Sequence, residues 1–283
     1  MQEASSGTLY VVATPIGNLN DISSRALTIL QQVDYIACED TRRTQILLNH
    51  YGINKPCRIL QAHNEMEASQ SCLESLKSGQ SIALVTDAGT PLVSDPGFRL
   101  VSMAQNHDLK VSPIPGPSAL ITALSALGVP CEHFYFYGFL PSKSKQRIEL
   151  IEKLNDIETT MVFYEAPHRL KATFQDLNLV LGEERLCGLG REMTKHYEQY
   201  VTGSLKKINE QLATGLIPEK GECVIVVAGQ TKSVKQQSVD LLLNLLLKEL
   251  PLKSAVKITQ NYLGIAKNEA YARAVELLEQ KDN

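Results

Sequence analysis

Three loops rich in proline and glycine hold the residues of this chain that are best placed to do chemistry. They are Thr14-Pro-Ile-Gly-Asn18, Asp87-Ala-Gly-Thr-Pro-Leu-Val-Ser-Asp-Pro-Gly97 and Pro115-Gly-Pro-Ser-Ala119. Each follows a short apolar run, a pattern that predicts a buried strand leading into a turn. Ligands of α/β domains bind at the carboxyl ends of strands, so the three loops predict one site at one sheet edge. The first loop is not Gly-x-Gly-x-x-Gly, which argues against the usual dinucleotide cradle.

Asp87 is the most suggestive residue of these loops. It follows the apolar run at 82–85 almost at once, and a carboxylate there is costly unless it is paired or hydrogen-bonded. It is either a cofactor-site or catalytic residue, or a structural aspartate that accepts N–H bonds from its own loop. Asp95 is interpreted as a turn residue of Asp95-Pro96-Gly97. Pro15 and Gly17 favour a tight turn whose backbone a ligand can approach closely.

Further polar side chains stand at other predicted strand ends. Asp40 or Thr41 is a natural N-cap, whereas the adjacent Arg42 and Arg43 suit either phosphate contacts or surface ion pairs. His63-Asn-Glu65 offers an imidazole, an amide and a carboxylate on one loop. The basic segment Ser142-Lys-Ser-Lys-Gln-Arg147 is either a solvated helix start or an RNA-backbone contact. Other candidate substrate contacts are Tyr164, Glu165, His168, Arg169, Arg191 and Lys195, with Glu222 at a cleft mouth.

Composition limits the possible functions. The 283 residues carry a net charge of −3, so nucleic-acid binding would need a local basic patch. The six cysteines form no Cys-x-x-Cys pair and are interpreted as reduced core cysteines of a cytoplasmic protein. No metal site is expected, because no cysteine cluster or histidine pair has ligand spacing. No apolar stretch has the length of a membrane span, and a Gly-x-Ser-x-Gly hydrolase elbow is absent from the sequence.

The order of predicted elements indicates an α/β protein of two α/β domains with a small helical domain after them. Strand-like and helix-like segments alternate up to about residue 128, which favours a largely parallel sheet. A mixed sheet is expected next, and a polar linker at 231–238 precedes three helices. Ser238 or Asp240 would cap the first of these helices. The predicted domains are 8–128, 131–230 and 236–283.

The three loops, together with Cys38-Glu-Asp-Thr-Arg42, Phe163-Tyr-Glu-Ala-Pro-His-Arg169 and Lys220-Gly-Glu222, resemble the tetrapyrrole-methylase (class III) S-adenosylmethionine methyltransferases. Within that family they are similar to the members that methylate the 2′-hydroxyl of a cytidine in the decoding centre of 16S rRNA. The resemblance covers nearly the whole chain. It implies S-adenosylmethionine bound in a cleft between the two α/β domains, the small ribosomal subunit as substrate, and a homodimer.

The resemblance and the residue types together give a set of expected site residues. The residues expected at the cofactor are Pro15, Asp87, Gly89, Thr90, Leu92, Ser118, Ala119, Tyr164 and Glu222. A ribose hydroxyl needs a base or a cation to act as a nucleophile. The candidates for base are Asp87, Glu65 and His63, and Lys195 and Arg191 could stabilise the developing alkoxide. The residues expected to bind RNA are Arg42, Arg43, Lys143, Lys145 and Arg147.

Two questions stay open at this stage. The same cofactor site could serve a small, tetrapyrrole-like substrate, or the fold could persist in a non-catalytic RNA-binding protein. The C-terminal helices, with a turn at Leu263-Gly-Ile265, are either a helix-turn-helix nucleic-acid module or a structural bundle. Gln260 departs from the helix-turn-helix pattern, in which a small residue is usual.

Overall fold

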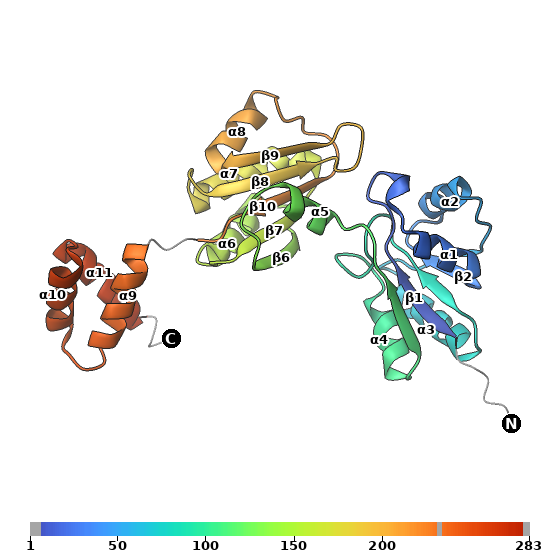
Figure 1. The fold of residues 1–283 in the computed structure, drawn as a ribbon, viewed down its shortest axis with the longest axis horizontal. Coiled ribbons are helices and arrows are strands. Elements are labelled where there is room, and N and C mark those ends of the chain that lie inside the picture. Colours follow the sequence, from blue (N-terminus) through green and yellow to red (C-terminus); the bar gives the residue numbers. More distant parts are fainter. Residues whose placement is uncertain (1–6, 231–233, 280–283) are drawn as a thin grey trace. The chain divides into compact units, whose positions relative to one another are not determined.

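The computed structural model describes residues 7–230 and 234–279, which form two compact units (Figure 1). The first unit comprises the chain up to Asn155 together with Thr159–Ala228, and the second comprises Asp156–Glu158 and the chain from Gly229 onward. The first unit contains two five-stranded sheets. The three-domain division at 8–128, 131–230 and 236–283 stays a prediction.

The first sheet is entirely parallel, with the strand order β3-β2-β4-β1-β5. Its strands are β1 (Thr8–Val12), β2 (Tyr35–Cys38), β3 (Cys57–Ile59), β4 (Ile82–Leu84) and β5 (Lys110–Ile114). Because β4, β1 and β5 are neighbours, the loops that follow these three strands leave the sheet side by side. This order places the three Pro/Gly-rich loops at one edge, as the sequence predicts.

Helices cover both faces of this parallel sheet (Figure 1). They are the 3-10 helix η1 (Leu19–Asp21) and helices α1 (Ser24–Gln32), α2 (Thr41–His50), α3 (Glu65–Lys77) and α4 (Phe98–Asn106). One face of the sheet packs on α1 and α2 through residues such as Leu30 and Leu48. The other face packs on α3 and α4 through Leu76 and Leu100. Strands buried on both faces read as continuous apolar runs, which explains the sequence pattern.

The second sheet is mixed, with the order β6-β7-β10-β8-β9. Strand β6 pairs with β7 in parallel, whereas the other neighbours are antiparallel. Its strands are β6 (Phe134–Phe139), β7 (Thr160–Glu165), β8 (Leu186–Arg191), β9 (Gln199–Ser204) and β10 (Cys223–Val227). The accompanying helices are α5 (Ala119–Ala126), α6 (Ser144–Leu154), the 3-10 helix η2 (Pro167–Arg169), α7 (Leu170–Leu181) and α8 (Leu205–Ala213). Helix α5 packs on this sheet through Ala123 and Leu124, which meet Val162 and Val226.

Three helices form the second unit around a core of their own. They are α9 (Val234–Leu246), α10 (Leu252–Leu263) and α11 (Lys267–Glu279). Leu243, Val256 and Ile265 are buried together in this core. Gly264 ends α10 in the left-handed conformation at φ 61°, as a helix C-terminal glycine commonly does. No helix of the described ranges is both long and apolar enough to cross a bilayer.

The predicted elements need a few corrections. Helix α9 begins at Val234, so Ser238 and Asp240 lie inside it and do not cap it, and Asp240 pairs with Arg273 at 2.6 Å instead. Of the predicted linker 231–238, residues 231–233 lie outside the described ranges and the remainder begins α9. Helix α8 was not predicted, although Ser204 caps it and Leu205, Ile208 and Leu212 recur on its buried face.

Candidate active site

Hydrogen bonds join the three Pro/Gly-rich loops to one another. Thr14 and Gly89 exchange backbone N–H···O bonds of 2.9 and 3.0 Å, which ties the first loop to the second. The hydroxyl of Thr90 donates to the carbonyl of Pro117 at 3.2 Å, which ties the second loop to the third. A Cβ at Gly116 would lie 3.0 Å from that of Ala13, so the third loop also approaches the first closely. The structure therefore brings all three loops together.

A cavity of about 430 Å³ opens beside these loops. Its volume lies within the range of small-molecule sites. The expected cofactor residues that line it are Asp87, Gly89, Thr90, Ser118, Ala119, Tyr164 and Glu222. Pro15 lines a smaller adjoining hollow that shares Asp87 with the cavity, whereas Leu92 belongs to neither wall and packs against the α3 and α4 core.

Carboxylates dominate one wall of the cavity. Asp87 accepts a hydrogen bond from the backbone N–H of Asp40 at 3.1 Å and forms an ion pair with Arg43 at 3.3 Å. Glu39, beside it, accepts from the hydroxyl of Thr86 at 3.3 Å. Asp95 also lines the cavity. Negative charge of this kind suits a ligand that carries a sulfonium and an ammonium group. The described residues contain no group of metal-ligating side chains arranged to hold a metal ion.

Asp95, which was predicted to be a turn residue of Asp95-Pro96-Gly97, also lines the cavity. The pKa of its carboxyl group is raised to about 6, chiefly by burial and also by the negative charges of Glu39 and Asp87, while a hydrogen bond with Thr86 lowers it. A carboxylate in a cavity with a pKa near neutrality is a candidate for proton transfer. The only signal in the sequence was its position in the same loop as Asp87.

Aromatic side chains form another part of the cavity wall. The ring of Tyr164 meets those of Phe136 and Phe139 edge to face, with centroids 4.9 and 5.7 Å apart. Burial raises the pKa of the Tyr164 hydroxyl. Tyr164 and Phe139 both line the cavity together with Met193 and Val224. The part of this wall formed by Tyr164, Met193 and Val224 can accept a flat apolar group such as an adenine ring. The carboxylates and the aromatic wall therefore fit S-adenosylmethionine in charge and polarity.

Two of the predicted base candidates, His63 and Glu65, do not line this cavity. His63 is exposed beside a shallow hollow on α3. The carboxylate of Glu65 accepts hydrogen bonds from the backbone N–H groups of Gly97 and Arg99 at 2.9 and 3.2 Å. Glu65 therefore fixes the start of α4 and the end of the Asp87 loop, which is a supporting role.

The two cations proposed to stabilise an alkoxide also have other partners. Arg191 is buried and donates to Gln199, to the carbonyl of Lys220 at 2.9 Å and to that of Tyr197 at 3.2 Å. Lys195 bridges Glu192 and Glu222, with both Nζ–O distances 2.8 Å. Neither lines the cavity, although Lys195 pairs with Glu222, which does. Arg191 therefore holds the β8–β9 connection in place.

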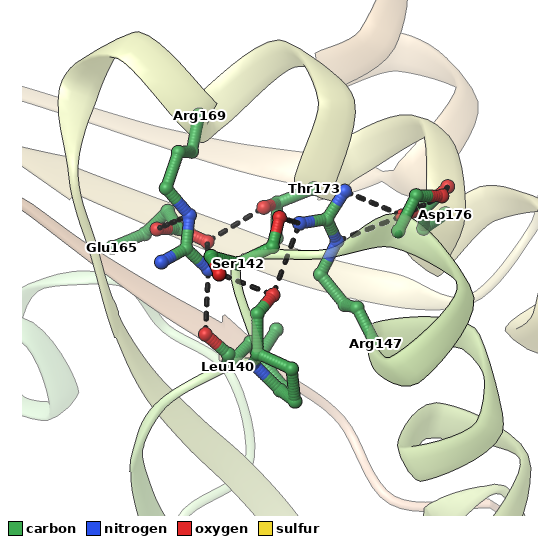
Figure 2. Close-up of polar contacts among 9 residues, drawn as sticks. Leu140, Ser142, Arg147, Glu165, Arg169, Thr173 and Asp176 are labelled. Atoms are coloured by element: carbon green, nitrogen blue, oxygen red, sulfur yellow. Dashed lines mark hydrogen bonds and ion pairs between the residues drawn. The ribbon is translucent and has the colours of Figure 1, made fainter.

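The residues expected to bind RNA separate into exposed and buried groups. Arg42 and Arg43 are exposed near the carboxylate wall, and Lys143 and Lys145 are exposed at the start of α6. Arg147, on the same helix, is only 2% exposed and forms an ion pair with Asp176 at 2.6 Å, which Figure 2 shows. A buried guanidinium with a buried partner has no face for a phosphate. Arg147 is therefore corrected from an RNA contact to a structural residue.

A family model described as "Tetrapyrrole (Corrin/Porphyrin) Methylases" matches residues 8–209, and the chain belongs to this family. A second model, "RsmI C-terminal HTH domain", matches residues 234–278. The chain is similar to proteins named "Ribosomal RNA small subunit methyltransferase I". The one from Haemophilus influenzae is 46% identical, with 96% of this chain and 98% of that protein covered. The one from Pseudomonas aeruginosa is 43% identical, with 96% and 98% covered.

Solved structures share the fold of the methylase region. Diphthine synthase matches with a TM-score of 0.60 and 16% identity, over 78% of this chain and 90% of that one. Uroporphyrin-III C-methyl transferase from Thermus thermophilus, complexed with S-adenyl homocysteine, matches with a TM-score of 0.54 and 15% identity, over 78% and 97%. The predicted fold class is thereby confirmed. The chain is a methyltransferase, and S-adenosylmethionine is its methyl donor.

Proposed function

We propose that this protein transfers the methyl group of S-adenosylmethionine to the ribose 2′-hydroxyl of a cytidine in the decoding centre of 16S rRNA. The observation that carries the proposal is the identity of 43–46% over nearly the whole chain to proteins named as methyltransferases of small-subunit ribosomal RNA. Two adjacent exposed cations support an anionic polymer as the substrate: Arg43, which lines the cavity and pairs with Asp87, and Arg42, which pairs with Asp40.

The chain's own residues must orient two reactants and accept a proton. When bound, the cofactor would supply a methyl group activated by its sulfonium, with the neutral thioether S-adenosylhomocysteine as the leaving group. The residues that would hold it are the loop at Asp87–Thr90, Ser118, Ala119 and the aromatic wall at Tyr164. Holding the hydroxyl in line with that methyl group contributes much of the rate. Of the base candidates, Asp87 lines the cavity and His63 and Glu65 do not, and we add Asp95 to the proposal.

The test is to incubate the protein with S-adenosylmethionine labelled in its methyl group, with small ribosomal subunits and with naked 16S rRNA in parallel. We expect label on the ribose of a cytidine in the decoding centre. Label on a base, or on RNA outside the decoding centre, would change the assignment. Failure to label either RNA substrate, together with turnover of a tetrapyrrole, would establish the small-molecule alternative that the family description favours.

We further propose that the protein acts as a homodimer in the cytoplasm, where ribosomal subunits are found. Exposed leucines one helical turn apart on α9, Leu241 and Leu245, support a protein contact of this kind. Sedimentation equilibrium of the full chain measures the stoichiometry. A monomer at micromolar concentration would overturn the dimer and leave the methylation proposal unaffected.

A further inference from the structure

Strand β6 carries an irregularity beside the cavity. It is an edge strand of six residues, Phe134-Tyr-Phe-Tyr-Gly-Phe139. It pairs with β7 up to Phe136, which lies opposite Val162. The pairing resumes at Gly138, which lies opposite the next β7 residue, Phe163. Tyr137 is therefore an extra residue with no partner in β7. Such a bulge shifts every later side chain of the strand to the opposite face.

The bulge changes the direction of one aromatic ring. With strict alternation, Phe139 would lie on the face opposite to Phe136. With the extra residue it lies opposite Tyr164, on the same face as Phe136, and both rings contact Tyr164. Gly138 makes the bulge possible, because its φ of 85° is unfavourable for residues with a Cβ. A Cβ at this position would also lie only 3.1 Å from the hydroxyl oxygen of Ser94. Strand β6 thus reaches the Asp87–Gly97 loop.

Two arginines fix the backbone that follows Phe139, as Figure 2 shows. Arg169 donates to the carbonyls of Leu140 and Pro141 at 2.5 and 3.1 Å, and the buried Glu165 pairs with its guanidinium at 3.1 Å. Arg147 donates to the carbonyls of Pro141 and Ser142 at 3.2 and 3.3 Å. The segment that carries Phe139 is therefore held by buried charged groups rather than free to collapse onto the core.

Phe139 nevertheless remains 55% exposed while it lines the cavity. An aromatic side chain held in place with an open face offers a surface for a flat group. The exposed Lys143 and Lys145 follow four and six residues later, where they can meet phosphates. Phenylalanine has no polar group, so it recognises the face of a base and not its hydrogen-bonding edge.

We propose that Phe139 is a stacking site for a nucleobase of the single-stranded RNA substrate, and that the β6 bulge exists to turn its ring into the cavity mouth. This proposal rests on the proposed function, because it takes RNA as the substrate. The base in contact is that of the methylated nucleotide or of its immediate neighbour. Stacking there positions the ribose next to the methyl donor.

The test compares full-length variants in methylation of small ribosomal subunits. Phe139→Leu keeps apolar volume but removes the aromatic face, and Phe139→Tyr keeps that face. Since stacking on an aromatic side chain commonly contributes about 1–3 kcal/mol per base, we expect Phe139→Leu to raise KM for subunits about tenfold. We expect Phe139→Tyr to stay near wild type. Tyr135→Leu is the matched control, because Tyr135 is a 43% exposed aromatic residue of the same strand that does not line the cavity.

Two further readouts separate stacking from other roles. S-adenosylmethionine affinity, measured by calorimetry, should be unchanged in Phe139→Leu, because the ring meets the substrate and not the cofactor. The salt dependence of RNA binding should keep its slope, since stacking releases no counterions. A loss of cofactor affinity, a change in oligomeric state or wild-type KM in Phe139→Leu would each overturn the proposal. If the wild-type protein itself fails to methylate subunits, the proposed function fails instead.

Discussion

At the scale of single residues, the cavity is defined by carboxylates with different partners. Asp87 has an arginine and a backbone N–H group within reach, whereas Asp95 is partly buried beside two other negative groups. Different surroundings separate the proton affinities of chemically identical groups. The two aspartates are therefore expected to contribute differently to binding and to proton transfer.

Asp87 is expected to be needed for cofactor binding. We predict that Asp87→Ala lowers S-adenosylmethionine affinity at least tenfold, or abolishes turnover, and leaves the fold intact, because its ion-pair partner Arg43 is largely exposed. Calorimetry measures the affinity and circular dichroism the fold. Asp108→Ala, at an exposed carboxylate outside the cavity, is the control. Wild-type affinity and activity in a folded Asp87→Ala protein would remove Asp87 from the site.

Asp95 gives a prediction for stability as a function of pH. Its pKa is raised from 3.8 to about 6 on folding, so the folded state prefers the neutral form. The stabilisation of the folded state by neutral Asp95 is fully present below about pH 4. It is lost as the pH rises through about 6. Asp95→Asn should therefore stabilise the protein at pH 7.5 by about 1 kcal/mol, after allowance for solvent screening, and by much less at pH 4.

Thermal unfolding of wild type and Asp95→Asn at the two pH values measures this difference. If Asp95 also accepts the proton of the ribose hydroxyl, the more stable variant loses turnover, and the wild-type rate falls as the pH drops below about 6. An equal change in stability at both pH values would show that ionisation of Asp95 is not the cause.

At the scale of elements, the sequence predicted helices and strands well wherever buried residues recur with a regular spacing. Continuous apolar runs marked β1, β2 and β4 of the parallel sheet, and of the two predicted N-caps before α2, Asp40 or Thr41, Asp40 is the one that caps the helix. Phe139 and Glu39 were missed as cavity residues. Their positions depend on a β-bulge and on strand order, and neither is visible as a period in the sequence. His63 and Glu65 do not line the cavity, because a loop position alone does not determine which way a side chain points.

The basic residues at the start of α6 also show that the sequence alone does not distinguish buried from exposed side chains, because they looked equivalent in the sequence. Arg147 is buried with Asp176, whereas Lys143 and Lys145 are exposed. We predict that Arg147→Ala lowers the free energy of unfolding by about 3 kcal/mol, since it leaves a buried carboxylate unpaired. Chemical denaturation of this variant tests the structural role directly. Unfolding equal to wild type would contradict it.

The exposed lysines of α6 should behave in the opposite way. We predict that Lys143→Gln with Lys145→Gln leaves stability unchanged, because neither side chain is buried. RNA affinity should fall and its dependence on salt should flatten, because fewer counterions are released on binding. Titrations of small-subunit RNA at several salt concentrations measure both quantities. A slope identical to that of wild type would exclude this segment from the RNA contact.

At the scale of the whole molecule, the cofactor cavity and the C-terminal helices belong to different compact units. The described residues of the helical unit form a core of their own, which includes Leu243, Val256 and Ala274. The unit also leaves Tyr262 78% exposed on α10, where the ring is open to a partner. These features favour a role in binding the substrate rather than in the chemistry.

A chain that ends near Gln230 should therefore fold and bind S-adenosylmethionine with wild-type affinity. We predict that it loses at least tenfold in kcat/KM on small ribosomal subunits, because a second contact raises the effective concentration of the reaction centre at its target. The measurement sets kcat/KM beside cofactor affinity for the full-length and truncated proteins. If truncation instead abolishes cofactor binding or makes the protein insoluble, the C-terminal helices serve the core or a dimer interface. Unchanged kcat/KM in a soluble truncated protein would exclude the substrate-binding role.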